Sequence, residues 1–236
     1  MTSLRSSAIP VSDPSAGLRI TEIFYSLQGE ANTAGLPTVF IRLTGCPLRC
    51  TYCDTTYSFE GGERRSLDDI IQTALDFKTP HICVTGGEPL AQPNALPLMQ
   101  RLADLGCEVS LETSGALDVS KVDARVSKVL DLKTPASGES ARNLLSNLDY
   151  LTAHDQIKFV ICSREDYEWS KQQVELHKLN EKAGTVWFSP AFAVEKGAAR
   201  LPQLARDLAQ WILEDRLPVR FQLQLHKLLW NDETGR

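Results

Sequence analysis

The sequence predicts an α/β protein built on a mostly parallel sheet. Short runs rich in Val, Ile, Leu and Phe alternate with amphipathic segments of helical period. The helical segments have the length expected of right-handed crossovers between parallel strands. The expected strands are Arg19–Tyr25, Thr38–Leu43, His81–Thr85, Glu108–Glu112, Val129–Lys133, Ile157–Ile161, Val186–Ser189 and Val219–Leu225.

Four helices are expected between these strands. Ser66 and Asp69 form a capping-box start before the first helix, and Asn94 is the expected N-cap of the second. Gly106 ends the second helix, and the longer helices cover about Glu165–Ala183, stopped by Gly184, and Pro202–Asp215. Because parallel sheets place their chemistry at the carboxyl ends of the strands, the loops that follow the strands are the informative ones.

Composition excludes several classes of protein. Hydrophobic residues make up 42% of the 236 residues and charged residues 23%, as in ordinary globular proteins. No apolar run approaches the ~18 residues of a membrane-spanning helix. The net charge of −5 gives no overall basic field for a nucleic-acid backbone. We therefore expect a cytoplasmic protein that binds neither membrane nor nucleic acid.

The chain is expected to form one domain, residues 18–236, behind a flexible tail, residues 1–17. The tail is rich in Ser and Pro and lacks the apolar segment of a secretory signal. A cleaved organelle transit peptide is the alternative for this tail. No repeat or change in composition marks a second domain.

Three cysteines lie within eight residues, directly after the expected strand Thr38–Leu43. Cys46, Cys50 and Cys53 have the spacing C-x3-C-x2-C. Three thiolates can hold three irons of a cubane cluster and leave the fourth iron open to the amino and carboxylate groups of a small molecule. Ferredoxin-type clusters and structural zinc sites use four protein ligands. For zinc, the fourth would have to be a histidine or one of the distant cysteines Cys83, Cys107 and Cys162.

A second motif, Gly86-Gly87-Glu88-Pro89, ends the expected strand His81–Thr85. Two glycines let backbone approach a ligand closely, and Glu88 supplies a carboxylate for an ammonium group. Alone, this motif could be an ordinary turn between a strand and a helix. At a strand end downstream of a three-cysteine loop, it favours a shared ligand site.

These two motifs resemble the radical SAM superfamily, and further stretches resemble its 7-carboxy-7-deazaguanine synthase family from about Ile20 to Trp230. The stretches are FYSLQGE (24–30), FIRL (40–43), CDT (53–55), ETSG (112–115), DLKTP (131–135), KFVI (158–161) and QLHK (224–227). The resemblance implies a partial (β/α) barrel. It also implies conversion of 6-carboxy-5,6,7,8-tetrahydropterin to 7-carboxy-7-deazaguanine with loss of ammonia, for queuosine or another deazapurine pathway.

The resemblance also implies cofactors, partners and site residues. The cofactors are a [4Fe–4S] cluster on Cys46, Cys50 and Cys53, S-adenosylmethionine (SAM), and Mg2+ at Thr55. An electron donor such as flavodoxin or ferredoxin and a homodimeric assembly are expected. The implied substrate contacts are Leu27, Gln28, Gly29, Arg42 and Thr85, with Glu112 and His226 as catalytic candidates. The implied SAM contacts are Gly87, Glu88, Asp131, Leu132, Lys133, Ser189 and Pro190.

Two other functions remain open from the sequence. One is a radical SAM activase that makes a glycyl radical on a partner protein. Many such activases carry extra cysteine clusters, which Cys83, Cys107 and Cys162 do not form. The other is a non-catalytic zinc-binding interaction module.

Overall fold

The computed structural model describes residues 17–191, 203–231 and 233–235. Their nine strands form one sheet in the order β3-β1-β2-β4-β5-β6-β7-β8-β9. All neighbours from β2 to β9 are parallel, whereas β1 pairs antiparallel with β2 and β3. The strands are β1 (Gly17–Leu27), β2 (Pro37–Leu43), β3 (Glu63–Ser66), β4 (His81–Gly86), β5 (Glu108–Thr113), β6 (Ser127–Asp131), β7 (Gln156–Ile161), β8 (Thr185–Pro190) and β9 (Arg220–Phe221).

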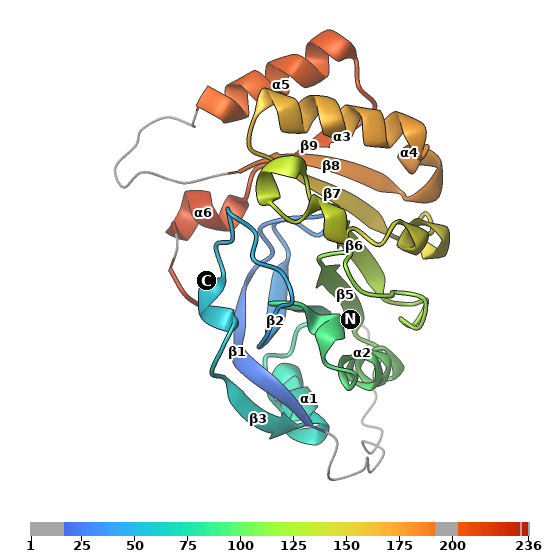
Figure 1. Ribbon diagram of the computed structural model, residues 1–236. Helices are drawn as coiled ribbons and strands as arrows, with labels where there is room; N and C mark the ends of the chain where they lie inside the picture. The colour runs from blue at the N-terminus through green and yellow to red at the C-terminus, as the bar shows by residue number, and fades with distance from the viewer. Residues whose placement is uncertain (1–16, 192–202, 232, 236) are drawn as a thin grey trace.

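The two edges of this sheet do not meet, so the architecture is a partial barrel, as expected. Figure 1 shows the strongly twisted sheet, with α1 and α2 beside its β1–β5 part and α3 and α5 beside its β7–β9 part. The α-helices are α1 (Leu67–Asp76), α2 (Ala95–Asp104), α3 (Arg164–Leu176), α4 (Leu179–Lys182), α5 (Gln203–Asp215) and α6 (Leu225–Trp230). Short 3-10 helices cover Thr56–Ser58, Pro89–Ala91, Pro135–Ser137, Ser140–Arg142 and Leu145–Tyr150.

Alternation along the strands separates a core face from a cavity face. Ile41, Val84, Leu111 and Leu130 are fully buried in the hydrophobic core together with helix residues such as Leu98. Their strand neighbours Phe40, Arg42, Thr85, Glu112, Val129 and Asp131 line a cavity on the opposite face. Because successive strand residues point to opposite faces, one sheet holds both the helix layer and the polar interior.

Both predicted helix starts, Ser66 for α1 and Asn94 for α2, are confirmed, but only one of them has a side-chain cap. The side chain of Ser66 accepts a hydrogen bond from the backbone of Asp69 at 3.2 Å and caps α1. Asn94 makes no capping bond; its amide instead donates to the Gly17 carbonyl oxygen at 3.1 Å and ties α2 to β1. Gly106 adopts a φ of 85° directly after α2, which fits its predicted role in ending that helix.

Three segments of the structure differ from the prediction. The polar edge strand β3 lacks apolar alternation and was not expected. The predicted helix Glu165–Ala183 is divided into α3 and α4, because Lys178 adopts a left-handed conformation with a φ of 50°. Of the predicted strand Val219–Leu225, only β9 forms in the structure. Leu225 instead begins α6, and its backbone N–H donates to the Gly29 carbonyl oxygen.

Residues 1–16 of the predicted tail and Pro202 lie outside the described residues, whereas Gly17 is the first residue of β1. Among the described residues, no helix is long and apolar enough to cross a membrane.

Candidate active site

A cavity of about 260 Å³ lies where the carboxyl ends of the parallel strands meet. It brings together residues from β1, β2, β4, β5, β6, β7 and α6 that are far apart in the sequence. Most of the predicted site residues line it: Leu27, Gln28, Gly29, Arg42, Cys46, Cys50, Cys53, Thr55, Thr85, Gly87, Glu112, Asp131, Lys133 and His226. Glu88, Leu132, Ser189 and Pro190 do not line it.

The three motif cysteines lie on one wall of this cavity as free, partly exposed thiols. Their loop is held by backbone hydrogen bonds, from Gly45 N to the Ser58 oxygen at 2.8 Å and from Thr51 N to the Ser137 oxygen at 3.1 Å. Burial raises the pKa of the Cys46 and Cys50 thiols, and metal coordination would deprotonate them. No three His, Cys, Asp or Glu side chains among the described residues converge on a single metal ion. Three thiols that line one cavity suit a cubane cluster whose fourth iron has no protein ligand.

The Gly86-Gly87 turn fits tightly against the cysteine loop. Gly87 N donates to the Leu43 oxygen at 3.1 Å, and Glu88 N donates to the Gly45 oxygen at 2.8 Å. A Cβ on Gly87 would lie 2.2 Å from the Gly45 oxygen. The two glycines therefore allow backbone to approach backbone, whereas the sequence suggested a close approach to a ligand.

Glu88 is placed differently from its expected role. It is fully buried, and its carboxylate accepts hydrogen bonds from Thr113 Oγ1 at 2.9 Å, Ser114 N at 2.7 Å and Leu90 N at 3.0 Å. Ser114 Oγ donates to the same carboxylate at 2.5 Å. With its oxygens occupied by these donors, the Glu88 side chain fixes the loop after β5 and has no place for the ammonium group of a ligand.

The predicted substrate contacts Arg42, Thr85 and Glu112 lie on neighbouring strands in register. Thr85 Oγ1 donates to Glu112 Oε2 at 2.9 Å, and Gln28 Nε2 donates to Glu112 Oε1 at 3.4 Å. Burial lowers the pKa of Arg42, but Tyr57 and Glu22 outweigh this and keep the guanidinium charged. A cation, a carboxylate and an amide thus face one polar chamber.

The loop after β1 packs directly against α6. A Cβ on Gly29 would lie 2.1 Å from His226 Nδ1, so only glycine permits this contact. Gln28 is buried, and its side chain also accepts from Glu30 N at 3.2 Å. The SLQGE and QLHK stretches therefore form one continuous wall, which places His226 in the cavity as expected.

Two unsatisfied polar atoms point to a ligand near the cysteines. Asp131 Oδ1 and the Tyr52 hydroxyl are buried without a hydrogen-bond partner, although both residues line the cavity. The other Asp131 oxygen binds Lys133 Nζ at 2.7 Å. A buried polar group normally has a partner, so this wall fits the polar groups of SAM beside the three cysteines. Leu132 is in the hydrophobic core, and Ser189 and Pro190 are buried at the end of β8 and do not line the cavity.

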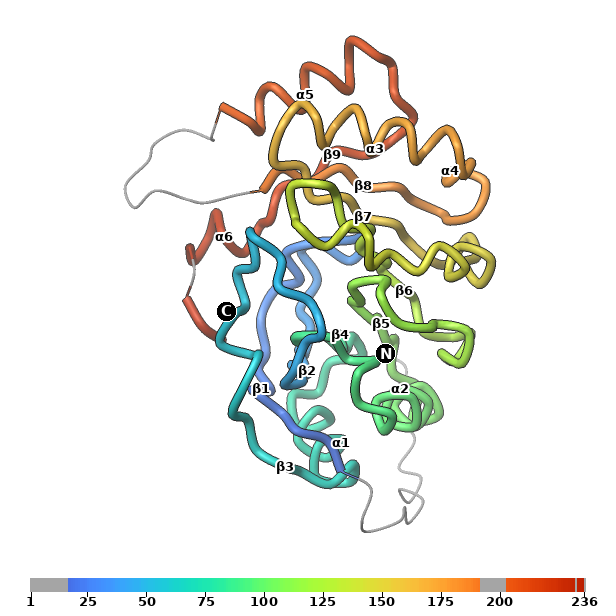
Figure 2. Tube along the Cα trace, viewed as in Figure 1, coloured from blue at the N-terminus to red at the C-terminus, as the bar shows by residue number. Residues whose placement is uncertain are grey.

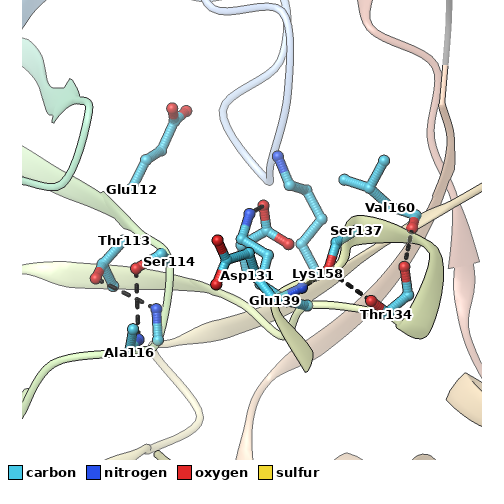
Figure 3. A network of polar contacts seen from close by, with 12 residues as sticks. Glu112, Thr113, Ser114, Ala116, Asp131, Thr134, Ser137, Glu139, Lys158 and Val160 are labelled. Atoms are coloured by element: carbon cyan, nitrogen blue, oxygen red, sulfur yellow. Dashed lines mark hydrogen bonds and ion pairs between the residues drawn. The ribbon is translucent and has the colours of Figure 1, made fainter. Parts of the chain in front are cut away.

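Several cavity residues were missed by the sequence analysis. Lys158 Nζ binds Glu30 Oε2 at 2.5 Å, and Gln224 Nε2 donates to Glu30 Oε1 at 2.6 Å. Burial raises the pKa of Glu30, but Lys158 and His226 outweigh it and lower the pKa overall. Figure 3 shows Glu112 and Lys158 extending from the same side of the sheet, with Asp131 between them. A lysine inside the apolar run Ile157–Ile161 was the signal that could have indicated this position.

Thr55 lines the cavity just after the cysteines, and its hydroxyl donates to Asp54 Oδ1 at 2.8 Å. Asp54 in turn binds Lys227 Nζ of α6 at 2.9 Å. Figure 2 shows the segment after β2 running beside α6. The Asp54–Lys227 pair thus joins the end of the cysteine loop to the C-terminal helix.

Comparison with known proteins agrees with this site. A model of the radical SAM superfamily matches residues 40–137. The 7-carboxy-7-deazaguanine synthase of Koribacter versatilis is 44% identical over 92% of this chain and 99% of that protein. The corresponding synthase of Chlorobaculum tepidum is 42% identical over 93% and 97%. The crystal structure of QueE from Escherichia coli shares the fold, with a TM-score of 0.71 and 22% identity over 89% of this chain and 95% of that chain.

The partial barrel and its three-cysteine loop define a radical SAM enzyme, which holds a [4Fe–4S] cluster and SAM. When bound, these groups supply a reductively generated adenosyl radical. With relatives of such identity along nearly its whole length, the chain belongs to the 7-carboxy-7-deazaguanine synthase family, whose members are lyases. This assignment decides against the glycyl-radical activase and the zinc-binding module.

Proposed function

We propose that the enzyme converts 6-carboxy-5,6,7,8-tetrahydropterin to 7-carboxy-7-deazaguanine and ammonia, for queuosine or a related deazapurine pathway. Substrate and product differ by one NH3, so the reaction needs no net oxidant. The observation that carries the proposal is a single chamber that contains the cysteine loop, a charged arginine and a glutamate–glutamine pair. The names of the full-length relatives support the product.

The chemistry of the chamber suits both ends of this pterin. The guanidinium of Arg42 matches the geometry of the substrate carboxylate. The amide of Gln28 and the carboxylate of Glu112 offer a donor and acceptors for the guanine-like edge, with Thr85 orienting Glu112. Glu112 and His226 are the proposed groups for moving a proton, while Leu27 and Gly29 complete the wall against the ring.

The opposite wall suits the cofactors. Cys46, Cys50 and Cys53 would hold the cluster, and backbone at Gly87 would lie beside it. Asp131, Lys133 and Tyr52 are the proposed contacts of SAM. Burial raises the pKa of Tyr52, and Asp131 raises it further, so its hydroxyl stays a hydrogen-bond donor.

We propose Thr55 as the protein ligand of Mg2+. Thr55 lines the cavity and its hydroxyl lies beside Asp54. Mg2+ often binds few protein oxygens and completes its octahedron with water or substrate. There it would polarise the carboxylated ring as a Lewis acid.

Partner and location are also proposals. The enzyme needs a reductant, and we propose flavodoxin or ferredoxin as that donor, because the cysteine loop is partly exposed. The six cysteines are all free thiols, which supports a cytoplasmic location. One continuous sheet supports a single domain, and we propose a homodimer as the assembly, since two-fold dimers are the commonest closed oligomers.

The direct test is anaerobic incubation of the reconstituted enzyme with SAM, a reductant and 6-carboxytetrahydropterin. We expect 7-carboxy-7-deazaguanine by mass spectrometry, formed faster with Mg2+ than with a chelator. The Arg42→Lys variant should bind substrate more weakly, because lysine cannot form the bidentate pair. Cleavage of SAM without any deazapurine would contradict the proposed substrate while leaving the enzyme class intact.

A further inference from the structure

Glu22, a residue outside the predicted site, binds the guanidinium of Arg42 at Nε. The two residues lie directly opposite each other in the antiparallel β1–β2 pair. Arg42 Nε donates to Glu22 Oε1 at 2.8 Å, and both side chains are more than four-fifths buried. Glu22 therefore contacts the guanidinium only at Nε. A carboxylate can also bind an arginine through both terminal nitrogens, and this arrangement is absent here.

Tyr57 contacts the same carboxylate of Glu22. Its hydroxyl donates to Glu22 Oε1 at 2.8 Å, the oxygen that also binds Arg42. Two donors on one oxygen hold Glu22 in the orientation that meets Nε.

Aromatic rings confine the guanidinium as well. Its central carbon lies 5.8 Å from the centre of the Phe24 ring and 5.9 Å from that of Tyr57. Phe24 is itself stacked on Phe40 at 4.9 Å. Within the residues that the structure describes, neither terminal nitrogen of Arg42 has a hydrogen-bond partner, and Arg42 lines the cavity.

We propose that Glu22 and Tyr57 are positioning residues that hold Arg42 by Nε, so that its two terminal nitrogens receive the substrate carboxylate as a pair. This inference rests on the proposed function, since it assumes a carboxylated pterin. The consequence is specificity. Because the guanidinium is oriented before binding, only ligands with a carboxylate at the ring edge bind more tightly as a result. A pterin without that group gains nothing from the arrangement.

The test compares two ligands on the reconstituted enzyme with SAM under anaerobic conditions. The probes are pterin-6-carboxylate and unsubstituted pterin, and the measurement is Kd from pterin fluorescence. For Glu22→Gln we expect Kd for pterin-6-carboxylate to rise about tenfold, and for Tyr57→Phe about threefold, from loss of hydrogen bonds to charged groups. Kd for pterin should change less than about twofold in either variant.

Matched controls separate positioning from general effects. Tyr25→Phe removes a hydroxyl from a tyrosine that is as exposed as Tyr57 but lies outside the cavity, and Glu63→Gln removes an exposed acid from β3. Both should bind the two ligands like the parent enzyme, with unchanged iron content and circular dichroism.

The outcomes distinguish the two proposals. Equal or tighter binding of pterin-6-carboxylate by Glu22→Gln would overturn the positioning role, because removal of the acid would then only unmask the charge of Arg42. Equal weakening for both pterins would do the same and indicate a structural role. If the parent enzyme shows no preference for the carboxylated ligand and makes no deazapurine, the proposed function itself is wrong.

Discussion

The glycines of the site act by letting two backbone segments touch. At Gly87 the nearest atoms are the carbonyl group of Gly45 and the Cβ of Cys46. At Gly29 the nearest atoms belong to His226. In both positions a methyl group would occupy space already filled by a neighbouring segment of the site. The requirement for glycine is thus steric at these residues, where φ is not positive.

The Gly87→Ala variant tests this reading at the cluster. Its Cβ would push against the Gly45 oxygen at 2.2 Å, directly before Cys46, and displace the cysteine loop. We expect reconstituted iron per chain to fall by about half or more, because a rigid backbone contact relaxes poorly.

Gly35→Ala is the control for this experiment. It has no atom within 4 Å of its Cβ position and costs only backbone strain, since its φ is 88°. It should keep its iron. Full iron content in Gly87→Ala would show that the close contact does not position the thiolates.

At the scale of elements, the C-terminal helix α6 completes the cavity. The segment before it has the alternating sequence of a strand. Past β9, the chain turns from its neighbour β8 to the loop after β1, where Leu225 N donates to the Gly29 oxygen and α6 begins. Lys227 then binds Asp54 at 2.9 Å and joins α6 to the end of the cysteine loop. Burial raises the pKa of Asp54, but Lys227 and the Thr55 hydroxyl outweigh it, and the pKa lies well below its ordinary range.

The sign of this shift predicts how α6 responds to pH. A carboxyl group with a lowered pKa in the folded state contributes stability above its ordinary pKa of about 3.9. That contribution is lost only as the pH falls through the lower folded value. The protection that this ion pair gives the α6 amides, measured by hydrogen exchange as the difference between the parent and an Asp54→Asn variant, should therefore stay constant from about pH 8 to about pH 5.

The Asp54→Asn variant removes the ion pair itself. Its α6 amides should exchange about two to five times faster than those of the parent, as expected for a partly exposed pair. Asp104→Asn, which breaks an exposed pair with Arg125, should leave α6 unchanged. A difference between the parent and Asp54→Asn that disappears at mildly acid pH would contradict a lowered pKa for Asp54.

At the scale of the whole molecule, the strand ends could be located from the sequence because buried parallel strands are recognisable as apolar runs. The cysteines, Arg42, Thr85 and Glu112 follow or end such runs, and all line the cavity. The predicted contact of Glu88 with a ligand differs from the structure because a sequence motif does not reveal that Thr113 and Ser114 donate to its carboxylate.

The remaining site residues depend on tertiary contacts. Glu30, Lys158 and Gln224 meet only when the loop after β1, strand β7 and the start of α6 converge. Glu22 and Tyr57 reach Arg42 through antiparallel pairing and a 3-10 turn. The edge strand β3 and the break at Lys178 are likewise set by pairing and backbone geometry, which periodicity does not encode.

The most direct measurement of the central claim is the electron paramagnetic resonance spectrum of the reduced, anaerobically reconstituted enzyme, recorded before and after addition of SAM. We expect about four irons per chain and a cluster signal that changes when SAM is added, as an iron without a protein ligand requires. A signal indifferent to SAM, or a protein that binds zinc and no iron, would contradict the account.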